Sequence, residues 1–585
     1  MTRIAVVDKS KCNHVKCSDL CMKLCPVNRS GGNCIVLGED KKIVIDEKLC
    51  TGCGICVNRC PFEAISIINL PGEMDSQPIH QYGRNGFHLY NIPVPKFGQV
   101  VGIIGRNGIG KSTAIKILAG LIKPNMGDWQ KNDSSWDDMI AYFKGTEAQG
   151  FFEKVRDSQI KISYKPQQVD LIPEAHDGTV KELLQKADEK GELKKMAKEL
   201  ELEKVLDRNI KDISGGELQR VAIAATVLKK ANVYFFDEPT SYLDIKQRLR
   251  VSKFIRSLAN PETAVMVIEH DLIILDYMAD LIHLMYGKEA CYGIVSQPKS
   301  TRAGINIYLG GYMKDENIRF RDHVIKFESR EPVKMIKQNL LTSWKDIEVK
   351  LGDFQLKALK GEIFNNQVAG ILGTNGIGKT SFVKILAEVI KADKGKISEK
   401  VKVSYKPQYI DTGSEDLVMV AIKEAIHKYS SAIVKPLELK PLLTKKLNEL
   451  SGGELQRVAI AECLARDADL YLLDEPSAYL DVEQRLKVSK IIRDVMDLRG
   501  ASAMVVDHDI LFIDYLSTSL IVFDGVPAEN GMAHGPFEMS EGMNMFLKDL
   551  NMTFRRDEET KRPRTNKPDS VMDRKQKSEG KLYYV

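Results

Sequence analysis

The sequence predicts an α/β protein in which two tandem copies of one domain follow a small, cysteine-rich α+β domain. Three observations predict this arrangement. GRNGIGKS at 105–112 returns as GTNGIGKT at 373–380, each time between an apolar run suited to a buried strand and a helical pattern. SGGELQRVA at 214–222 is repeated letter for letter at 451–459. Nine of the eleven cysteines lie within residues 1–60.

The repeated strings keep the same order in both copies, which indicates a duplicated domain rather than a short-period solenoid. The serines that begin SGGELQRVA are 237 residues apart. Lys111 and Lys379 are 268 apart, whereas Gln167 and Gln408 are 241 apart, so the first copy holds about 27 extra residues between these points. We expect the insert at 129–155, as a helix–loop–helix with aromatic faces. It is either a docking surface or an elaboration packed on its own core.

The predicted organisation has five parts. They are a cysteine-rich domain at 1–75, the first copy at 76–296, a connector at 297–322, the second copy at 323–535 and a basic C-terminal hinge segment at 536–585. For the last part, which is rich in Arg, Lys and Pro, a solvated tail is the alternative.

Composition narrows the class of protein. The chain is 43% hydrophobic and 28% charged, as is usual for a globular protein with a large core. No run reaches the ~18 apolar residues that cross a bilayer, and the first residues lack the apolar core of a signal peptide, so we expect a cytoplasmic protein. A net charge of +5 is too small to indicate a nucleic-acid partner by itself.

Both Gly-rich strings match GxxxxGK[ST], the loop that binds nucleotide phosphates. Glycines let the backbone approach closely, so that N–H groups point at phosphate oxygens. Lys111 and Lys379 place a positive charge near the β- and γ-phosphates, and Ser112 and Thr380 offer a hydroxyl to Mg²⁺. The other expected nucleotide-binding residues of these loops are Gly105, Asn107, Gly108, Gly110, Thr113, Gly373, Asn375, Gly376, Gly378 and Ser381.

Each copy also has an apolar strand that ends in a carboxylate pair, VYFFDEP and LYLLDEP. Asp237 and Asp474 suit contact with Mg²⁺, directly or through water. Glu238 and Glu475 suit a base that orients or polarises the attacking water. A strand-end cap or a surface pair is the alternative for these carboxylates.

Two further pairs lie at matched positions. His270 and His508 each follow another apolar strand, where an imidazole reaches the γ-phosphate and the base. Gln167 and Gln408 lie in matched SYKPQ segments, where an amide touches Mg²⁺ or the water, although KPQ is also good turn chemistry.

Ser-Gly-Gly leading into a helix builds an anion site at the helix N-terminus. A second phosphate-binding element in each copy makes sense if it reaches the nucleotide of the other copy. With these strings the sequence resembles the ATP-binding-cassette (ABC) ATPases. SGGE resembles their signature motif, and the other strings resemble their Walker A, Q-loop, Walker B, D-loop (YLD at 242–244 and 479–481) and H-loop.

The resemblance implies two tandem ABC-type P-loop nucleotide-binding domains and two composite ATP sites. Site one combines Lys111, Asp237, Glu238 and His270 with Ser451, Gly452 and Gly453, and site two combines Lys379, Asp474, Glu475 and His508 with Ser214, Gly215 and Gly216. Tyr82 is expected to stack on the adenine of the first copy, with Phe354 as its counterpart in the second. Core packing is the alternative for both rings.

The cysteines of the first domain have ferredoxin spacing. Residues 50–61 follow C-x₂-C-x₂-C-x₃-C-P, the run of bacterial-type ferredoxins, and residues 12–26 follow the variant C-x₄-C-x₃-C-x₃-C-P. In two-cluster ferredoxins the fourth cysteine of each run binds the other cluster. The predicted ligands are Cys12, Cys17, Cys21 and Cys60 for one [4Fe–4S] cluster, and Cys50, Cys53, Cys56 and Cys25 for the other. Cys34 is left over, structural zinc is the alternative, and a structural or mechanical role for the clusters is at least as well supported as electron transfer.

A bacterial-ferredoxin-like domain joined to two cassettes, the first with an insert, closely resembles the E-subfamily ABC ATPases, the ribosome-recycling family also called RNase L inhibitor. The resemblance covers nearly the whole chain. It implies an ATPase in which ATP closes the cassettes and moves the iron–sulfur domain, splitting the ribosome after termination or rescue. Connector and C-terminal arginines (Arg302, Arg319, Arg321, Arg555 and Arg556) are then expected to hold a hinge or to contact ribosomal RNA.

The implied partners are the ribosome, its small subunit with ribosomal RNA, and a release factor or its rescue paralogue. The protein is expected to remain on the small subunit toward initiation, near initiation factors, as a monomer without a membrane partner. Two alternatives stay open: a soluble ATPase subunit of a transporter, and an ATP-gated iron–sulfur electron-transfer protein.

Overall fold

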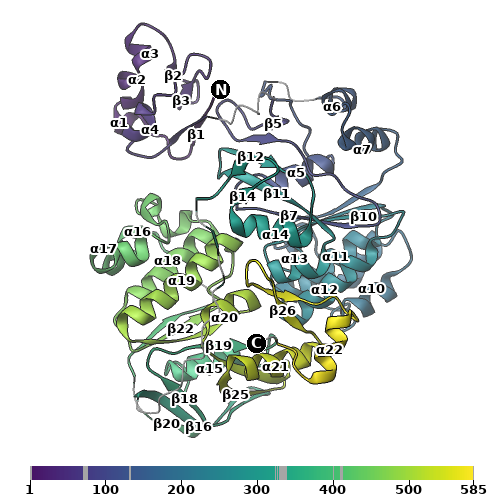
Figure 1. Cartoon of the computed structure of the whole chain (residues 1–585), viewed down its shortest axis with the longest axis vertical. Helices are drawn as coiled ribbons and strands as arrows, with labels where there is room; N and C mark the ends of the chain where they lie inside the picture. The colour runs from purple at the N-terminus through teal and green to yellow at the C-terminus, as the bar shows by residue number, and fades with distance from the viewer. Residues whose placement is uncertain are drawn as a thin grey trace. The chain divides into compact units, whose positions relative to one another are not determined.

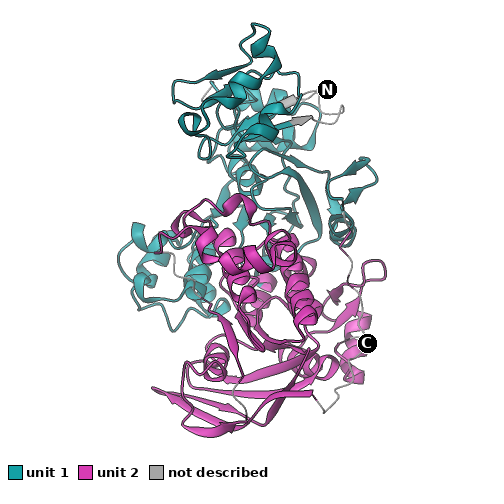
Figure 2. Ribbon diagram, turned by 90° about the vertical axis from the view of Figure 1, so that its left-hand side faces the viewer, with its two compact units in different colours: residues 1–239, 254–269, 279–322 teal, residues 240–253, 270–278, 323–585 magenta. Residues whose placement is uncertain are grey.

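The structure is a computed structural model that describes residues 3–69, 77–130, 134–322, 324–325, 327, 339–398, 401–408 and 413–583. The described chain forms two compact units (Figure 2): unit 1 comprises residues 1–239, 254–269 and 279–322, and unit 2 comprises 240–253, 270–278 and 323–585. The predicted boundary at 75/76 lies outside the described residues, as does residue 323 at the next boundary.

The N-terminal domain is a small α+β domain, as predicted. Strand β1 (Arg3–Val7) pairs antiparallel with β4 (Ile65–Asn69), and β2 (Ile35–Leu37) pairs antiparallel with β3 (Ile43–Ile45). Its short helices are α1 (His14–Cys17), α2 (Leu20–Leu24), α3 (Pro26–Arg29) and α4 (Ile55–Arg59). Cysteine side chains are part of its core, packed with aliphatic residues of the strands. A domain of this size buries little apolar surface, so groups that cross-link it add to its stability.

The first nucleotide-binding domain is built on a mixed sheet (Figure 1). Strands β8 (Ile162–Lys165), β9 (Val233–Asp237), β10 (Ala264–Ile268), β7 (Val100–Ile104) and β11 (Leu281–Lys288) are parallel neighbours in that order. The strings VVGII, VYFFD and AVMVI are buried along their whole length, which explains why they are continuously apolar. Four further strands extend the sheet: β5 (His80–Gln81), β6 (His88–Tyr90), β12 (Tyr292–Val295) and β13 (Lys299–Ser300). Their pairings are antiparallel except that β12 pairs parallel with β6.

The helices of this half follow from the sequence pattern. The phosphate loop leads into α5 (Lys111–Leu118), and SGG leads into α11 (Gly215–Leu228), whose N-terminus is closed by a capping box between Ser214 and Glu217. The remaining helices are α8 (Ile172–Ala175), α9 (Val180–Ala187), α10 (Leu193–Glu199), α12 (Ile245–Leu258) and α13 (Leu272–Met278).

The insert holds two helices, α6 (Trp136–Tyr142) and α7 (Glu147–Arg156). Ser135 caps α6 through a capping box with Asp138. Phe143 and Phe152 are buried in the same hydrophobic core as the sheet. The aromatic faces therefore pack mainly on the core of the domain, and Trp136 keeps about a third of its surface (36%) exposed.

The second nucleotide-binding domain repeats this plan within unit 2. Strands β21 (Val403–Lys406), β22 (Leu470–Asp474), β23 (Ser502–Val506), β19 (Val368–Leu372) and β24 (Ser519–Val526) are parallel neighbours in that order. The other strands are β16 (Leu340–Leu351), β17 (Phe354–Ala358), β18 (Gly361–Phe364), β20 (Lys394–Ile397) and β25 (Asn530–Glu538). The α-helices are α15 (Lys379–Leu386), α16 (Val418–Ala421), α17 (Lys423–Lys428), α18 (Gly452–Ala465), α19 (Val482–Arg499) and α20 (Ile510–Leu516).

The connector and the C-terminal segment are folded. The connector contains α14 (Thr301–Gly310) and the hairpin β14 (Tyr312–Met313) and β15 (Ile318–Arg319). The C-terminal segment contains α21 (Met539–Leu550), β26 (Phe554–Arg556), β27 (Pro563–Thr565) and α22 (Val571–Glu579). A solvated tail is therefore wrong as a reading of its composition, because its apolar side chains and the Arg562 side chain are buried.

Several of the basic residues in these segments are structural. Arg321 is buried, with its guanidinium 5.2 Å from the centre of the Tyr308 ring. Arg562 and Arg564 both bond to Asp276, at 3.3 and 2.9 Å within unit 2. Such buried pairs fix the position of the segment, since removal of one partner leaves a buried charge uncompensated. Among the described residues, no helix combines the length and apolar character needed to cross a membrane.

One asparagine ties the cysteine-rich domain to the first nucleotide-binding domain within unit 1. The Asn85 amide donates to the carbonyl oxygens of Ala5 and Ile45, and its oxygen accepts from the Ile45 amide, each at 2.9 Å. Its own carbonyl accepts from the Val7 amide at 3.0 Å. Asn85 has a φ of +56°, a conformation that asparagine tolerates better than most residues.

We predict that Asn85→Ala loosens this attachment. Three buried hydrogen bonds are lost, so the free energy of local opening falls by roughly 2–4 kcal/mol, or about 30- to 700-fold in the opening equilibrium. Hydrogen exchange checks this: amides of β1 and β3 lose protection while those of β7, β9 and β10 keep theirs. Asn91→Ala is the matched control, because exposed Asn91 also has a positive φ (+60°). Equal protection in the two variants contradicts the prediction.

Candidate functional site

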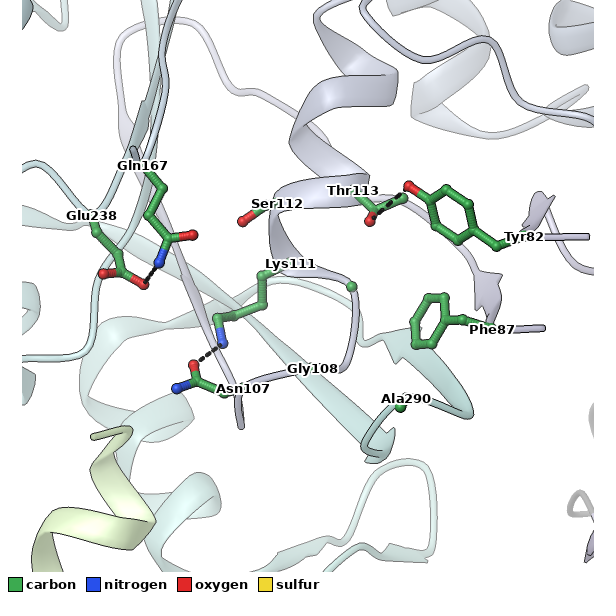
Figure 3. A pocket seen from close by; sticks show the side chains of 11 residues that line it. Tyr82, Phe87, Asn107, Gly108, Lys111, Ser112, Thr113, Gln167, Glu238 and Ala290 are labelled. Carbon is green, nitrogen blue, oxygen red and sulfur yellow. Dashed lines mark hydrogen bonds between the residues drawn. The ribbon is translucent and has the colours of Figure 1, made fainter. Parts of the chain in front are cut away.

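The first phosphate loop opens into a cavity of about 600 Å³ (Figure 3). The loop connects the end of β7 to the start of α5, and Gly108 and Gly110 have φ values of +71° and +90°. Lys111 Nζ donates to the carbonyl oxygens of Gly105 and Arg106, at 2.9 and 2.6 Å, and lies 3.4 Å from Asn107 Oδ1. This ammonium is held beside the loop, where it can transfer its hydrogen bonds to a phosphate.

The second phosphate loop has the same geometry in unit 2. Gly376 and Gly378 have φ values of +74° and +88°. Lys379 Nζ donates to the carbonyl oxygens of Gly373 and Thr374, at 2.9 and 2.5 Å. Burial lowers the pKa of Lys379 to about 8, and an anionic phosphate would restore the stability of its charged form.

A hydroxyl and a carboxylate meet beside each loop, as a Mg²⁺ site requires. Ser112 bonds to Asp237, and Thr380 Oγ1 donates to Asp474 Oδ2 at 2.7 Å. Burial raises the pKa of Asp237, and it raises the pKa of Asp474 to about 6. A buried carboxylate with a raised pKa lacks enough compensating positive charge, so these residues fit a divalent cation, which binds oxygen ligands. Bound Mg²⁺ supplies charge neutralisation at the β- and γ-phosphates.

Each of the two glutamates accepts a hydrogen bond from the glutamine of the SYKPQ segment in the same copy. Gln167 Nε2 donates to Glu238 Oε1 at 2.8 Å, and Gln408 Nε2 donates to Glu475 Oε1 at the same distance. Burial raises the pKa of Glu475, but His508 and Gln408 outweigh it and hold the pKa at about 2. His508 Nε2 is 3.5 Å from Glu475 Oε1. Glu475 is therefore ionised at neutral pH and can accept a hydrogen bond from an attacking water.

The aromatic residues correct one expectation. Phe354 lies against Gly378, where an added Cβ would be 2.9 Å from its ring, and Phe87 lies against Gly110 in the same way, at 2.7 Å. The counterpart of Phe354 is therefore Phe87, not Tyr82. Tyr82 lines the same cavity as Phe87, about half exposed, with its hydroxyl 3.3 Å from Thr113 Oγ1. The sequence spacing could have identified this pair, because Phe87 and Phe354 are 267 residues apart, close to the 268 that separate the loop lysines.

The D-loop of the first copy reaches the second phosphate loop within unit 2. Asp244 Oδ2 accepts a hydrogen bond from the Asn375 amide at 3.0 Å. Asp244 is buried, and it follows Tyr242, whose φ is +64°. A residue of one copy thus contributes to the loop that binds the nucleotide of the other.

The signature serines lie at helix N-termini. Ser214 caps α11 and Ser451 caps α18, and the hydroxyl of each donates to the glutamate three residues later, at 2.8 and 2.9 Å. Lys445 Nζ pairs with Glu454 at 2.9 Å and, against the effect of burial, helps to lower its pKa. The pairing of each signature with the phosphate loop of the opposite copy stays a prediction.

The cysteine thiols gather into two sets. The charges of Cys17, Cys60 and Cys12 add to burial in raising the pKa of Cys21 to about 12. Those neighbours are the other three predicted ligands of the first cluster.

In the second set, Cys50, Cys53 and Cys25 add to burial in raising the pKa of Cys56 to about 11, and they are its three predicted partners. The thiol of Cys34, which the spacing left without a role, lies against Cys25 and Cys50.

The number of thiols in each set fits a cluster. In a [4Fe–4S] cluster four thiolates bind, each to a different iron. Eight thiolates in two groups of four match two such clusters, which a bacterial-type ferredoxin domain holds through its cysteines.

Two P-loop domains with complete sets of ATPase residues, joined to a thiol-rich α+β domain, define an ABC-type ATPase with an iron–sulfur domain. Family models agree: ABC transporter at residues 95–241 and 356–478, 4Fe-4S binding domain at 43–66, and possible Fer4-like domain in RNase L inhibitor, RLI, at 2–33. The chain is an ATPase that uses ATP and Mg²⁺ and carries [4Fe–4S] clusters.

Relatives identify the family. Translation initiation factor RLI1 of Saccharomyces cerevisiae is 44% identical over 100% of this chain and 98% of its own length. A structure described as ribosome-bound archaeal Pelota and ABCE1 is similar at 51% identity, over 100% of this chain and 99% of the other, with a TM-score of 0.93. Archaeal ribosome recycling factor aABCE1, in complex with the stalk protein aP1, is 52% identical over 87% and 99%, with a TM-score of 0.83. The chain belongs to the ABCE1/RLI1 family, the E subfamily of ABC proteins.

For the iron–sulfur domain, we predict that Cys53→Ser removes one cluster. Iron content should fall from about eight to about four atoms per chain, with a matching loss of brown absorbance, while ATP binding is unchanged. Cys34→Ser is the control and should keep all of its iron, because Cys34 is not among the predicted ligands. Full iron content in Cys53→Ser, or loss of a cluster in Cys34→Ser, contradicts the assignment.

To test whether the Phe87 ring contacts adenine, we predict that Phe87→Ala weakens ATP binding at the first loop. Loss of an aromatic ring stacked on a base costs roughly 1–3 kcal/mol, so Kd should rise about tenfold. Titration with a fluorescent ATP analogue measures this in protein whose second loop carries Lys379→Ala. Phe87→Tyr retains the ring and should bind normally. If Phe87→Ala binds as tightly as Phe87→Tyr, the ring only packs the core.

Proposed function

We propose that the protein is an ATP-driven ribosome recycling factor of the cytoplasm. ATP binding brings its two nucleotide-binding domains together, the closure moves the iron–sulfur domain, and this movement splits the ribosome into subunits after termination or rescue. The protein then remains on the small subunit toward initiation. Hydrolysis of ATP reopens the two sites and releases the protein.

One observation carries this proposal: the chain combines two ABC-type nucleotide-binding domains with an iron–sulfur domain, and full-length relatives include translation factors. One such relative is named a translation initiation factor, one is described as ribosome-bound with Pelota, and one is called a ribosome recycling factor. These names favour ribosome recycling over the transporter and electron-transfer alternatives. They also support the ribosome, its small subunit and a release factor or its rescue paralogue as partners, with initiation factors nearby.

Two composite sites would make ATP the link between the domains. The duplicated SGG strings support this, because each copy already has its own phosphate loop. The hydrogen bond from the Asn375 amide to Asp244 supports it as well, because a D-loop residue of the first copy lies at the loop of the second. In each site, the proposed bases, Glu238 and Glu475, orient the attacking water.

Replacement of both bases tests the function. In Glu238→Gln/Glu475→Gln, ATP binds but hydrolysis falls by about 10²-fold or more, since an amide cannot polarise the water. We expect this variant to accumulate on small ribosomal subunits in a sucrose gradient when ATP is present. Lys111→Ala/Lys379→Ala is the control. It loses the positive charges that bind the nucleotide phosphates, so it should not accumulate on small ribosomal subunits. A variant that binds ATP tightly but sediments free of ribosomal particles contradicts recycling while leaving the ATPase intact.

A further inference from the structure

A lysine is buried beneath the proposed base in each copy. Lys165 ends β8 and Lys406 ends β21, and their exposed fractions are 0% and 1%. Lys165 Nζ donates to the main-chain carbonyls of Asp237 and Glu238, at 3.0 and 3.3 Å. Lys406 Nζ donates to those of Asp474 and Glu475, at 2.8 and 3.4 Å. The same two donor–acceptor pairs thus occur twice in one chain.

A second buried donor reaches the same carbonyl. Gln219 Nε2 donates to the Glu238 carbonyl at 2.7 Å, and Gln456 Nε2 donates to the Glu475 carbonyl at 2.6 Å. Both glutamines are almost fully buried, at 0% and 1% exposure. Each belongs to the helix that begins at a signature serine, α11 or α18. The carbonyl of the base is therefore held by two side chains from two different elements.

The backbone that these donors hold is strained. Glu238 and Glu475 have φ values of +46° and +47°, in the left-handed region that residues with a Cβ rarely occupy. Such a conformation is energetically unfavourable and persists only where surrounding contacts enforce it. This conformation breaks the regular alternation of side chains along the strand and directs the glutamate side chain toward Gln167 in the first copy and Gln408 in the second. The Glu238 amide is also fixed, by the Ile268 carbonyl at 3.0 Å.

A lysine is a costly residue for this place. Burial lowers the pKa of Lys165 to about 8, although the charges of Asp237, Glu238, Glu269 and Asp170 oppose the change. Burial likewise lowers the pKa of Lys406 to about 8, against Asp474, Glu475 and Asp507. An apolar side chain of the same length would fill the space without this desolvation. What it would not supply is a donor to two successive carbonyls and a positive charge beneath two carboxylates.

We propose that Lys165 with Gln219, and Lys406 with Gln456, are positioning residues for hydrolysis: they hold the strained main chain of Glu238 and Glu475 so that each carboxylate faces the attacking water. This inference rests on the proposed role of the two glutamates as bases. The four residues act through the glutamate and do not touch the nucleotide. Their removal should slow the chemical step and leave ATP binding in place.

The test replaces both lysines with methionine, which keeps the length of the side chain and removes the donor. A small displacement of a catalytic group can cost about 10²-fold, so we expect kcat for ATP to fall about 10- to 100-fold in Lys165→Met/Lys406→Met, with KM changed less than about threefold. The matched control is Lys161→Met/Lys402→Met, because these exposed lysines lie four residues earlier in each segment. The control should keep the kcat of the unmodified chain.

A second arm separates positioning from general damage. The lysine variant is placed in the Glu238→Gln/Glu475→Gln background, and single-turnover hydrolysis is measured. If the lysines act through the glutamates, their loss there slows hydrolysis by less than about twofold, as expected for groups that act as a unit. An equal loss in both backgrounds, or a rise in the Kd of a fluorescent ATP analogue that matches the loss of rate, overturns the proposal.

The glutamine arm guards against misfolding of the lysine variant. Gln219→Met/Gln456→Met removes the other donor and leaves the charge of the site unchanged. We expect kcat to fall about three- to tenfold, less than in the lysine variant, again with little change in KM. Unchanged kcat in both the lysine and the glutamine variants overturns the proposal. If Glu238→Gln/Glu475→Gln does not slow hydrolysis, the proposed bases are wrong. If that variant hydrolyses ATP slowly but the lysine and glutamine variants hydrolyse it at the normal rate, only the positioning residues are rejected.

Discussion

Each ATP site depends on one constraint of its sheet: parallel strands end at the same edge. In the first copy, β7 ends at the phosphate loop, β9 ends at Asp237 and β8 ends at Lys165. Strands β7 and β9 are buried on both faces, so they cannot shift without exposing apolar surface or breaking the ladder. The side chains that follow them are therefore brought together by the fold itself, and the same constraint acts in the second copy through β19, β22 and β21.

The electrostatics of these edges follow from burial. Asp474 has a raised pKa and Lys379 a lowered one, because each lies where water is excluded. Glu475 differs, since Gln408 and His508 stabilise its ionised form and keep its pKa near 2. Mg²⁺ and a triphosphate would thus balance the charges of Asp474 and Lys379, while the base is already ionised.

The sequence is most informative where the functional residues lie in short motifs, most of which occur twice. The phosphate loops, the strand-end carboxylates and the two sets of cysteines could be predicted because each has a local spacing with a chemical meaning. Lys165 and Asn85 could not be predicted this way, because their roles depend on which distant backbone each side chain meets. The solvated-tail alternative for the C-terminal segment is wrong for a related reason. Its charged composition hides the fact that Arg562 and Arg564 are matched by the buried Asp276.

Helix α11 carries both a signature serine at its N-terminus and a residue that holds a proposed base. Ser214 caps its N-terminus, and Gln219, which holds the carbonyl of Glu238, lies only five residues later, or about 7.5 Å along its axis. In the proposed closed form, Ser214 faces the nucleotide of site two, whereas Glu238 serves site one. A tilt of this helix that moves Ser214 would therefore also move Gln219 and the carbonyl it holds, so that about a turn and a half of helix would link the two sites.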